Sequence, residues 1–220
     1  MATDVKIRIE DKILNEVRQM FEDIGHDVTL HMFTSKEHCL LCNETLALAE
    51  QVAEQSDRIT LNHCECEDLE SENAKKWKIA RHPAIAIEGL AKGLVHFYGI
   101  PSGYEFGSLI ESLILAGKDG HLDLDPQIVE ELEKIDQPVH IQVFVTPTCP
   151  YCPRAVLAAI KFAMVNENIT ADCIEATEFI DLSNQYGVHG VPKTIINDVV
   201  EVVGAVPEQA LLAKVKEALK

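Results

Sequence analysis

The chain has 220 residues, 47% of them hydrophobic, and this length can bury a core in one large domain or in two small ones. Its 36 acidic side chains outnumber its 19 basic ones, for a formal net charge of -17. Such a charge repels phosphate backbones and anionic membrane surfaces, so we expect neither a nucleic acid nor a membrane as a partner.

The amino-terminal segment carries no recognisable targeting signal. Residues 1–6 lack the basic stretch and apolar core of a signal peptide, and no apolar run in the chain reaches membrane-spanning length. We therefore expect a cytoplasmic protein. Cytoplasmic thiols are normally kept reduced, so the seven cysteines predict redox or metal chemistry rather than a structural disulfide framework.

The first half of the chain alternates helix and strand patterns. Apolar residues at helical spacing predict a helix over residues 9–24, and residues 28–33 have the pattern of a short buried strand. A polar turn leads to the dithiol Cys39-Leu40-Leu41-Cys42, which a helix follows. The further predicted elements are a helix at 43–55, a strand at 58–66, a charged surface helix at 68–79, strands at 81–87 and 94–98, and a helix at 107–116.

The second half shows the same order of elements. A helix is predicted over residues 124–135 and an apolar strand over 139–145. That strand leads into Thr146-Pro147-Thr148-Cys149-Pro150-Tyr151-Cys152-Pro153, a second dithiol. The elements after it are a helix at 154–165, a strand at 169–174, a helix at 179–186, strands at 190–196 and 199–203, and a helix at 207–219.

Landmarks of the first half recur in the second half at offsets of 109 to 111 residues, which is the size of a domain. Parallel strands need a crossover helix, whereas a short turn joins antiparallel strands. We therefore predict an α/β protein of two tandem units, residues 1–119 and 120–220, each with a mixed four-stranded sheet flanked by helices. The matched landmarks are Phe33 with Phe144, Cys39 with Cys149, Cys64 with Cys173, and Pro83 with Pro192.

The Cys149 dithiol has the spacing of a redox centre. If Cys149 begins the helix, unpaired backbone N–H groups and the helix dipole favour its thiolate, so Cys149 is the expected nucleophile. Cys152 lies three residues further on the same helix face. This spacing places the two Cα atoms about 5 to 6 Å apart, within the range of a disulfide, so Cys152 can resolve a mixed disulfide.

A dithiol between strand and helix, followed by a proline that opens a later strand, resembles the thioredoxin fold. The duplicated chain resembles the tandem protein disulfide oxidoreductases, or glutaredoxin-like proteins, of archaea and thermophilic bacteria. The resemblance implies thiol–disulfide exchange at Cys149 and Cys152, with a second centre at Cys39 and Cys42. It also implies protein disulfides as substrates, a thioredoxin reductase-like flavoprotein and a peroxiredoxin as partners, and no cofactor beyond the redox-active disulfides.

In that family the proline at the start of the third strand is cis and presents neighbouring backbone to the substrate. The matching prolines are Pro83, preceded by His82, and Pro192, preceded by Val191. A trans proline at a strand edge is the alternative. His82 and His189 lie near these prolines and are candidates for ionising a thiol, although such histidines are more often surface groups.

The chain departs from the thioredoxin pattern in its acids. Thioredoxins carry an acid for proton transfer in the strand before the dithiol, and residues 141–145 contain none. The candidates by position are Glu175 and, in the first half, Glu65 or Glu67. The apolar pair Leu40-Leu41 should desolvate the first dithiol and raise its thiol pKa values.

The remaining cysteines allow two interpretations. Free cysteine packs well as a small apolar residue, so Cys64, Cys66 and Cys173 are expected to fill the core. The alternative is a metal-binding or scaffold protein of the same fold. Its metal or iron–sulfur site would use Cys39, Cys42, Cys64 and Cys66, with His38 or His63.

Overall fold

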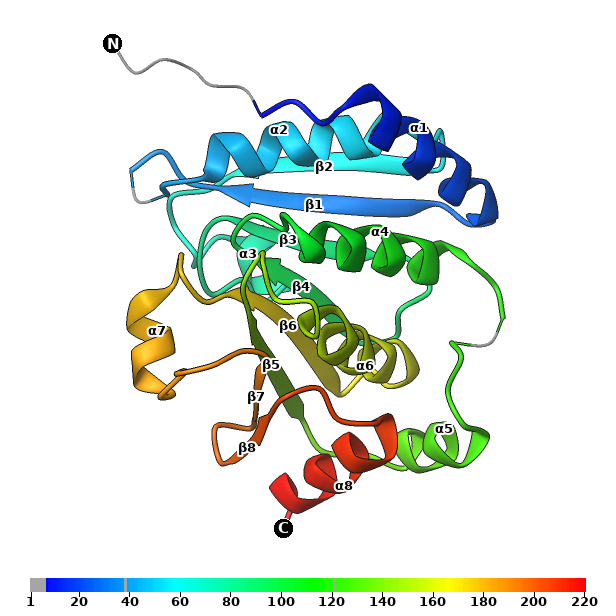
Figure 1. Ribbon diagram of the computed structural model, residues 1–220, viewed down its shortest axis with the longest axis vertical. Coiled ribbons are helices and arrows are strands. Elements are labelled where there is room, and N and C mark those ends of the chain that lie inside the picture. The colour runs from blue at the N-terminus through cyan, green and yellow to red at the C-terminus, as the bar shows by residue number, and fades with distance from the viewer. Residues whose placement is uncertain (1–6, 38, 121) are drawn as a thin grey trace.

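The computed structural model describes residues 7–37, 39–120 and 122–220, so residues 1–6, used above to argue against a signal peptide, lie outside the described residues. The order of helices and strands is as predicted (Figure 1). Within the described part of the chain, none of the helices has the length and apolar character of a membrane span.

The elements of the first half are α1 (Asp11–Met20), η1 (Phe21–Asp23), β1 (Val28–Thr34), α2 (Cys42–Ala53), β2 (Ile59–Glu65), α3 (Glu72–Lys76), β3 (Ala84–Glu88), β4 (Leu94–Tyr98) and α4 (Tyr104–Gly117). Those of the second half are α5 (Pro126–Glu133), β5 (Val139–Val145), α6 (Cys152–Val165), β6 (Ile169–Glu175), α7 (Ile180–Gln185), β7 (Lys193–Ile196), β8 (Val200–Val203) and α8 (Glu208–Ala218).

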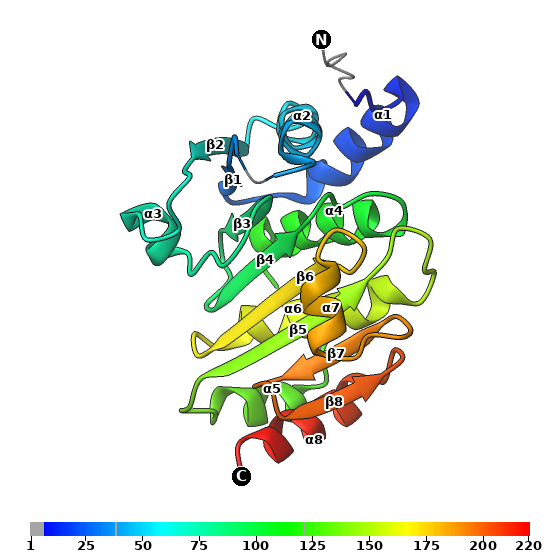
Figure 2. The ribbon, with the colours of Figure 1, turned by 90° about the vertical axis from the view of Figure 1, so that its left-hand side faces the viewer.

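The strands form one eight-stranded mixed sheet in the order β2-β1-β3-β4-β6-β5-β7-β8 (Figures 1 and 2). Each half supplies four neighbouring strands, with one parallel and two antiparallel pairings. The halves meet where β4 pairs in parallel with β6, so that Phe97 lies beside Cys173. The sequence predicted the two four-stranded sheets but not their fusion. The unit boundary between residues 119 and 120 falls between α4 and α5 and stays a prediction.

Helices cover both faces of this sheet. The larger apolar core lies under α1, α2, α4, α5, α6 and α8, and includes Leu48, Leu109 and Phe162. A smaller core, around Phe33 and Trp77, lies on the opposite face beneath α3 and α7. Figure 2 shows α7 in front of the sheet and α6 behind it.

Two helices begin at other residues than the sequence predicted. The charged segment at 68–79 forms only the five-residue α3, which Ser71 caps. α6 begins at Cys152, two residues before the predicted start at 154, and does not include Cys149. Cys149 precedes Pro150, and a proline ring disfavours helical backbone in the residue before it. The predicted nucleophile therefore lies in the turn before the helix.

The junction between the halves contains a buried charge. The carboxylate of Asp172 on β6 accepts hydrogen bonds from His96 Nδ1 on β4, at 2.8 Å, and from His140 Nε2 on β5, at 2.6 Å. Burial by itself would raise the pKa of Asp172, but the two histidines outweigh it and hold that pKa well below its usual range. Burial likewise opposes the charged form of His140, and the bond to Asp172 outweighs it and raises the pKa of His140. Asp172 thus ties strands of both halves together.

Asp172→Asn should lower the free energy of unfolding by about 3–5 kcal/mol, because it removes the buried charge partner of two histidines. The stability that comes from the raised His140 pKa is fully present below the unfolded histidine pKa of about 6.5, and it is lost as pH rises through the folded pKa. The wild-type protein should therefore lose stability with rising pH more steeply than the variant. Urea denaturation at a series of pH values measures both effects.

The matched control is Asp181→Asn, which changes an exposed acid on α7. It should alter the free energy of unfolding by less than about 0.5 kcal/mol. Equal losses for the two substitutions would contradict the role assigned to the buried cluster.

Candidate active site

The second dithiol lies at the carboxyl end of β5, in the turn that leads into α6. The Cys149 N–H donates to the Thr146 carbonyl at 3.1 Å, and the Cys152 N–H donates to the Cys149 carbonyl at 3.4 Å. Both thiols are free. Cys149 is 8% exposed and Cys152 is 0% exposed, so Cys149 is the sulfur that an approaching disulfide reaches first.

Both proline loops have the cis geometry that the family resemblance implied. The His82–Pro83 and Val191–Pro192 peptide bonds are cis. The Cys149 thiol donates a hydrogen bond to the Val191 carbonyl at 3.6 Å. Backbone of the second loop therefore lies against the Cys149 sulfur.

An open groove of about 400 Å³ continues from this loop toward α7. Thr146, just before the dithiol turn, lines it together with Ile180 and Val191. His189, which the sequence offered as an aid to thiol ionisation, also lines the groove. The groove is mostly apolar and open to solvent, and its wall includes Val191, whose carbonyl contacts the Cys149 thiol.

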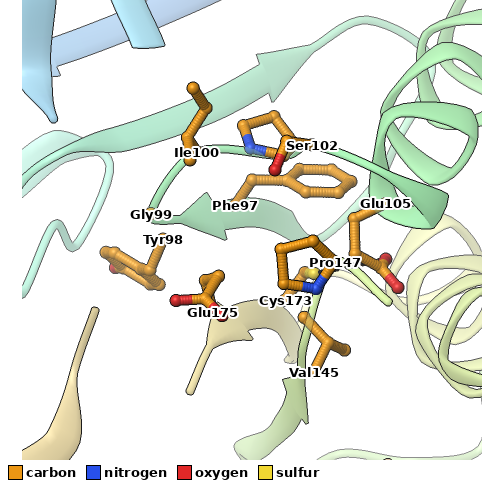
Figure 3. Close-up of a pocket in the computed structure, with 11 residues that line it drawn as sticks. Phe97, Tyr98, Gly99, Ile100, Ser102, Glu105, Val145, Pro147, Cys173 and Glu175 are labelled. Atoms are coloured by element: carbon orange, nitrogen blue, oxygen red, sulfur yellow. Dashed lines mark hydrogen bonds between the residues drawn. The ribbon is translucent and has the colours of Figure 1, made fainter. Parts of the chain in front are cut away.

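A buried acid from the first half lies beside this dithiol. Glu105, near the start of α4, is 2% exposed, and its Oε2 accepts a hydrogen bond from the Cys173 thiol at 3.7 Å (Figure 3). Burial raises the pKa of Glu105 to about 7. Burial, the neighbouring Cys149 sulfur and the charge of Glu105 raise the pKa of Cys152 far above its usual range. The charge of Glu105 therefore adds to the effect of burial on the Cys152 thiol.

Glu105, Cys173 and Glu175 line one small cavity at the junction of the halves (Figure 3). Its volume of about 10 Å³ is close to the minimum that a single water molecule needs. Glu175, the acid predicted for proton transfer, accepts hydrogen bonds from Thr177 Oγ1 at 2.7 Å and from the Glu178 N–H at 2.6 Å. These bonds hold Glu175 toward its own loop, whereas Glu105 contacts a cysteine.

Sequence reasoning missed Glu105. The predicted helix began at Gly107, whereas α4 begins at Tyr104, and an acid in the first turn of a helix is ordinarily a solvated group. Glu105 also belongs to the other half of the chain. One sequence feature could have pointed to such a residue: the strand before Cys149 contains no acid. A buried dithiol after that strand then needs a proton acceptor from another segment of the chain.

The first dithiol is oxidised in this structure. Cys39 and Cys42 form a disulfide with their Cα atoms 5.5 Å apart. Cys42 begins α2, and its sulfur accepts a hydrogen bond from the Ser35 N–H at 3.3 Å. Leu40 is 89% exposed, so it does not cover the disulfide as the sequence suggested.

The two acids predicted near the first dithiol bind other groups. Glu67 accepts hydrogen bonds from the Ser35 hydroxyl and from the Lys36 N–H, which lower its pKa. Glu65 forms an ion pair with the Lys36 ammonium at 2.6 Å. In these positions both acids bind residues of the loop before Cys39 and not a cysteine sulfur.

The alternative four-cysteine metal site does not form in this structure. Two of its ligands, Cys39 and Cys42, are bonded to each other. Of its candidate histidines, His63 shares a hydrogen bond of 2.8 Å with Thr34 Oγ1, and His38 lies outside the described residues. Over the described ranges, no group of three or more histidine, cysteine or acidic side chains is arranged to hold a metal ion.

Comparison with known proteins identifies the family and the fold. The family model of the thioredoxin domain matches residues 139–217. A crystal structure of a protein disulfide oxidoreductase from Aeropyrum pernix is 31% identical, covers 96% of this chain and 94% of its own, and superposes with a TM-score of 0.86. The chain belongs to the protein disulfide oxidoreductase family. Its tandem thioredoxin-like architecture is therefore confirmed.

Other relatives of this disulfide oxidoreductase chain are longer proteins. The chain is 24% identical to an NADH dehydrogenase of Bacillus subtilis and 28% identical to one of the subunits of alkyl hydroperoxide reductase from Pseudomonas aeruginosa. The matches cover 90% and 78% of this chain but only 35% and 31% of those proteins, so the chain spans about a third of their length. A structure of the alkylhydroperoxide reductase AhpF from Enterococcus faecalis, 21% identical over 93% of this chain and 98% of its own, shares the fold with a TM-score of 0.85.

Glu105→Gln should lower the pKa of Cys152, because the amide removes a negative charge that disfavours the Cys152 thiolate. NMR of Cβ-labelled cysteine, or the pH dependence of alkylation in a Cys149→Ser background, measures this pKa. Glu111→Gln, on the same helix, is the matched control and should leave the pKa unchanged. An unchanged Cys152 pKa in Glu105→Gln would show that this carboxylate does not act on the dithiol.

Proposed function

We propose that the protein catalyses thiol–disulfide exchange in protein substrates through Cys149 and Cys152. The contact between the Cys149 thiol and the Val191 carbonyl, in the loop of cis-Pro192, carries this proposal. The Cys149 thiolate attacks one sulfur of a substrate disulfide, and the other substrate sulfur leaves as a thiolate. Cys152 then attacks Cys149, which releases the reduced substrate and leaves a Cys149–Cys152 disulfide. In reverse, the same steps introduce disulfides.

Glu105 takes the proton of Cys152 in the second step. Cys152 is fully buried, so bulk water cannot accept this proton directly. A carboxyl group with a pKa of about 7 exists in both forms at neutral pH, so Glu105 can accept the proton and later return it. Glu175, on the wall of the same cavity, is the proposed onward acceptor.

The first half supplies a second exchange centre. Its disulfide lies at the start of α2, in the half that carries the cis peptide bond before Pro83. Cys42 is buried and Cys39 is partly exposed, so Cys39 is the attacking sulfur and Cys42 the resolving one. This assignment repeats the arrangement of the second half.

The redox partners are proposed from the relatives. The NADH dehydrogenase and the alkyl hydroperoxide reductase protein each contain a segment similar to this chain within a longer protein. This supports a thioredoxin reductase-like flavoprotein as the electron donor, and a peroxiredoxin beside protein disulfides as an acceptor. The exchange steps use no bound cofactor apart from the dithiols. A cytoplasmic location stays a prediction.

Cys149→Ser should reduce insulin-disulfide reduction by at least about 100-fold in a Cys39→Ser background, because the attacking sulfur is lost. Dithiothreitol-coupled insulin precipitation measures the rate. Cys39→Ser alone is the control and should keep most of the activity. If the double variant retained full activity, exchange through Cys149 would be contradicted.

Cys152→Ser should instead accumulate a covalent adduct with substrate, because the mixed disulfide at Cys149 forms but is not resolved. Non-reducing electrophoresis detects the adduct, and added thiol should release it. Cys173→Ser, which changes a buried cysteine outside the dithiol, should accumulate no adduct. Equal adduct from both variants would contradict the resolving role.

A further inference from the structure

Lys193 is a buried lysine for which the proposed function has no role. It follows cis-Pro192 as the first residue of β7, and its side chain is 9% exposed. Its ammonium donates to the carbonyls of Tyr186 at 2.8 Å and Gly187 at 3.2 Å, and it forms an ion pair with Glu201 at 2.7 Å. A lysine is seldom buried unless its charge is paired, and here the three N–H donors of the ammonium meet three acceptors.

These contacts tie together the two ends of a loop. Residues 188–191 connect the end of α7 to cis-Pro192, and we call them the groove loop. The Val188 N–H donates to the Ser183 carbonyl at 2.8 Å, but among the described residues no backbone acceptor binds the N–H groups of 189–191. Tyr186 and Gly187 lie just before the groove loop and Lys193 lies just after it. One ammonium therefore fixes the distance between its ends.

The groove loop lies at the second dithiol. All four of its residues line the open groove that α7 and Thr146 also line. Its last residue, Val191, presents the carbonyl that accepts the Cys149 thiol at 3.6 Å. The same loop therefore contacts the attacking sulfur and bounds the space beside it, which is where the chain flanking a substrate disulfide would run.

The first half shows that the fold does not require this lysine. The strand pairings match Lys193 with Ala84, which follows cis-Pro83 and has no donor in its side chain. α3 nevertheless ends with the same backbone hydrogen bond as α7, from the Ile79 N–H to the Ala74 carbonyl at 2.8 Å. Termination of the helix therefore does not explain why a lysine is buried in the second half.

We propose that Lys193 is a positioning residue that sets the affinity of the second site for polypeptide substrates. The inference rests on the proposed exchange at Cys149 and adds a determinant of specificity to it. Because the ammonium holds both ends of the groove loop, the loop is ordered before the substrate arrives, and binding does not have to supply the ordering entropy. A small disulfide that reaches the Cys149 sulfur without lying along the loop gains nothing from this order.

Lys193→Met in the Cys39→Ser background tests the proposal, because methionine keeps an unbranched side chain without the ammonium. The KM for fluorescently labelled insulin should rise about tenfold while kcat changes less than about twofold, since a disordered loop weakens binding and leaves the dithiol intact. Stopped-flow reaction of the reduced chain with dithiodipyridine, a small uncharged disulfide, should change less than about twofold.

Lys161→Met is the matched control. It removes a lysine on α6 that donates to the Asp123 carbonyl at 3.4 Å, away from the groove, and it should alter neither reaction. Lys193→Gln, whose side-chain amide can still donate to a carbonyl, should raise the KM for insulin by less than Lys193→Met does. It is a second variant if methionine is not tolerated, and thermal unfolding checks that each variant folds.

An unchanged KM for insulin in both variants of Lys193 would overturn the proposal. Equal losses with insulin and dithiodipyridine would also overturn it, because a purely structural role would impair both reactions together. If the Cys39→Ser chain itself reacted with neither disulfide, the exchange at Cys149 would be contradicted, and with it the inference that rests on that exchange.

Discussion

The parallel pairing of β4 with β6 is the constraint on which the rest of the molecule depends. It joins two four-stranded sheets and so removes two edges that would otherwise expose unpaired backbone groups. The same junction buries Asp172 between His96 and His140. It requires a close approach at Gly93, where a Cβ atom would lie 2.1 Å from the Ile169 carbonyl oxygen. The two repeats are therefore one continuous structure and not two linked bodies.

This junction changes the chemistry of the second site. The strand before Cys149 contains no acid, so the second half by itself offers no carboxyl group from that strand. Fusion of the sheets brings α4 of the first half alongside, and with it Glu105, whose pKa burial raises to about 7. The Cys152 thiol thus lies within the field of a group from the opposite half. The fusion of the two sheets therefore contributes to the raised pKa of Cys152.

The two halves share one fold, but their cysteine side chains lie in different surroundings. Both have a cysteine at the start of a helix, but the first pair is bonded and the second is free. The strand pairings match Cys64 with Ile174, and not with Cys173 as the sequence spacing predicted. One residue beyond the second strand of each half, Cys66 occupies the position that Ala176 occupies in the other half. This difference places a thiol beside His82, where the second half has a methyl group.

Much of this protein could be read from local sequence. Apolar periodicity predicted the element order, and constant spacing revealed the repeat, the two dithiols and the proline pair, because each depends on residues close together in the chain. The position of Cys149 before α6 is also set locally, since Pro150 disfavours helical backbone at Cys149. The joined sheet, the approach of Glu105 to the Cys149 dithiol and the contact of Cys66 with His82 emerged only in three dimensions. Each depends on burial and on pairing between distant segments, which periodicity along a chain does not encode.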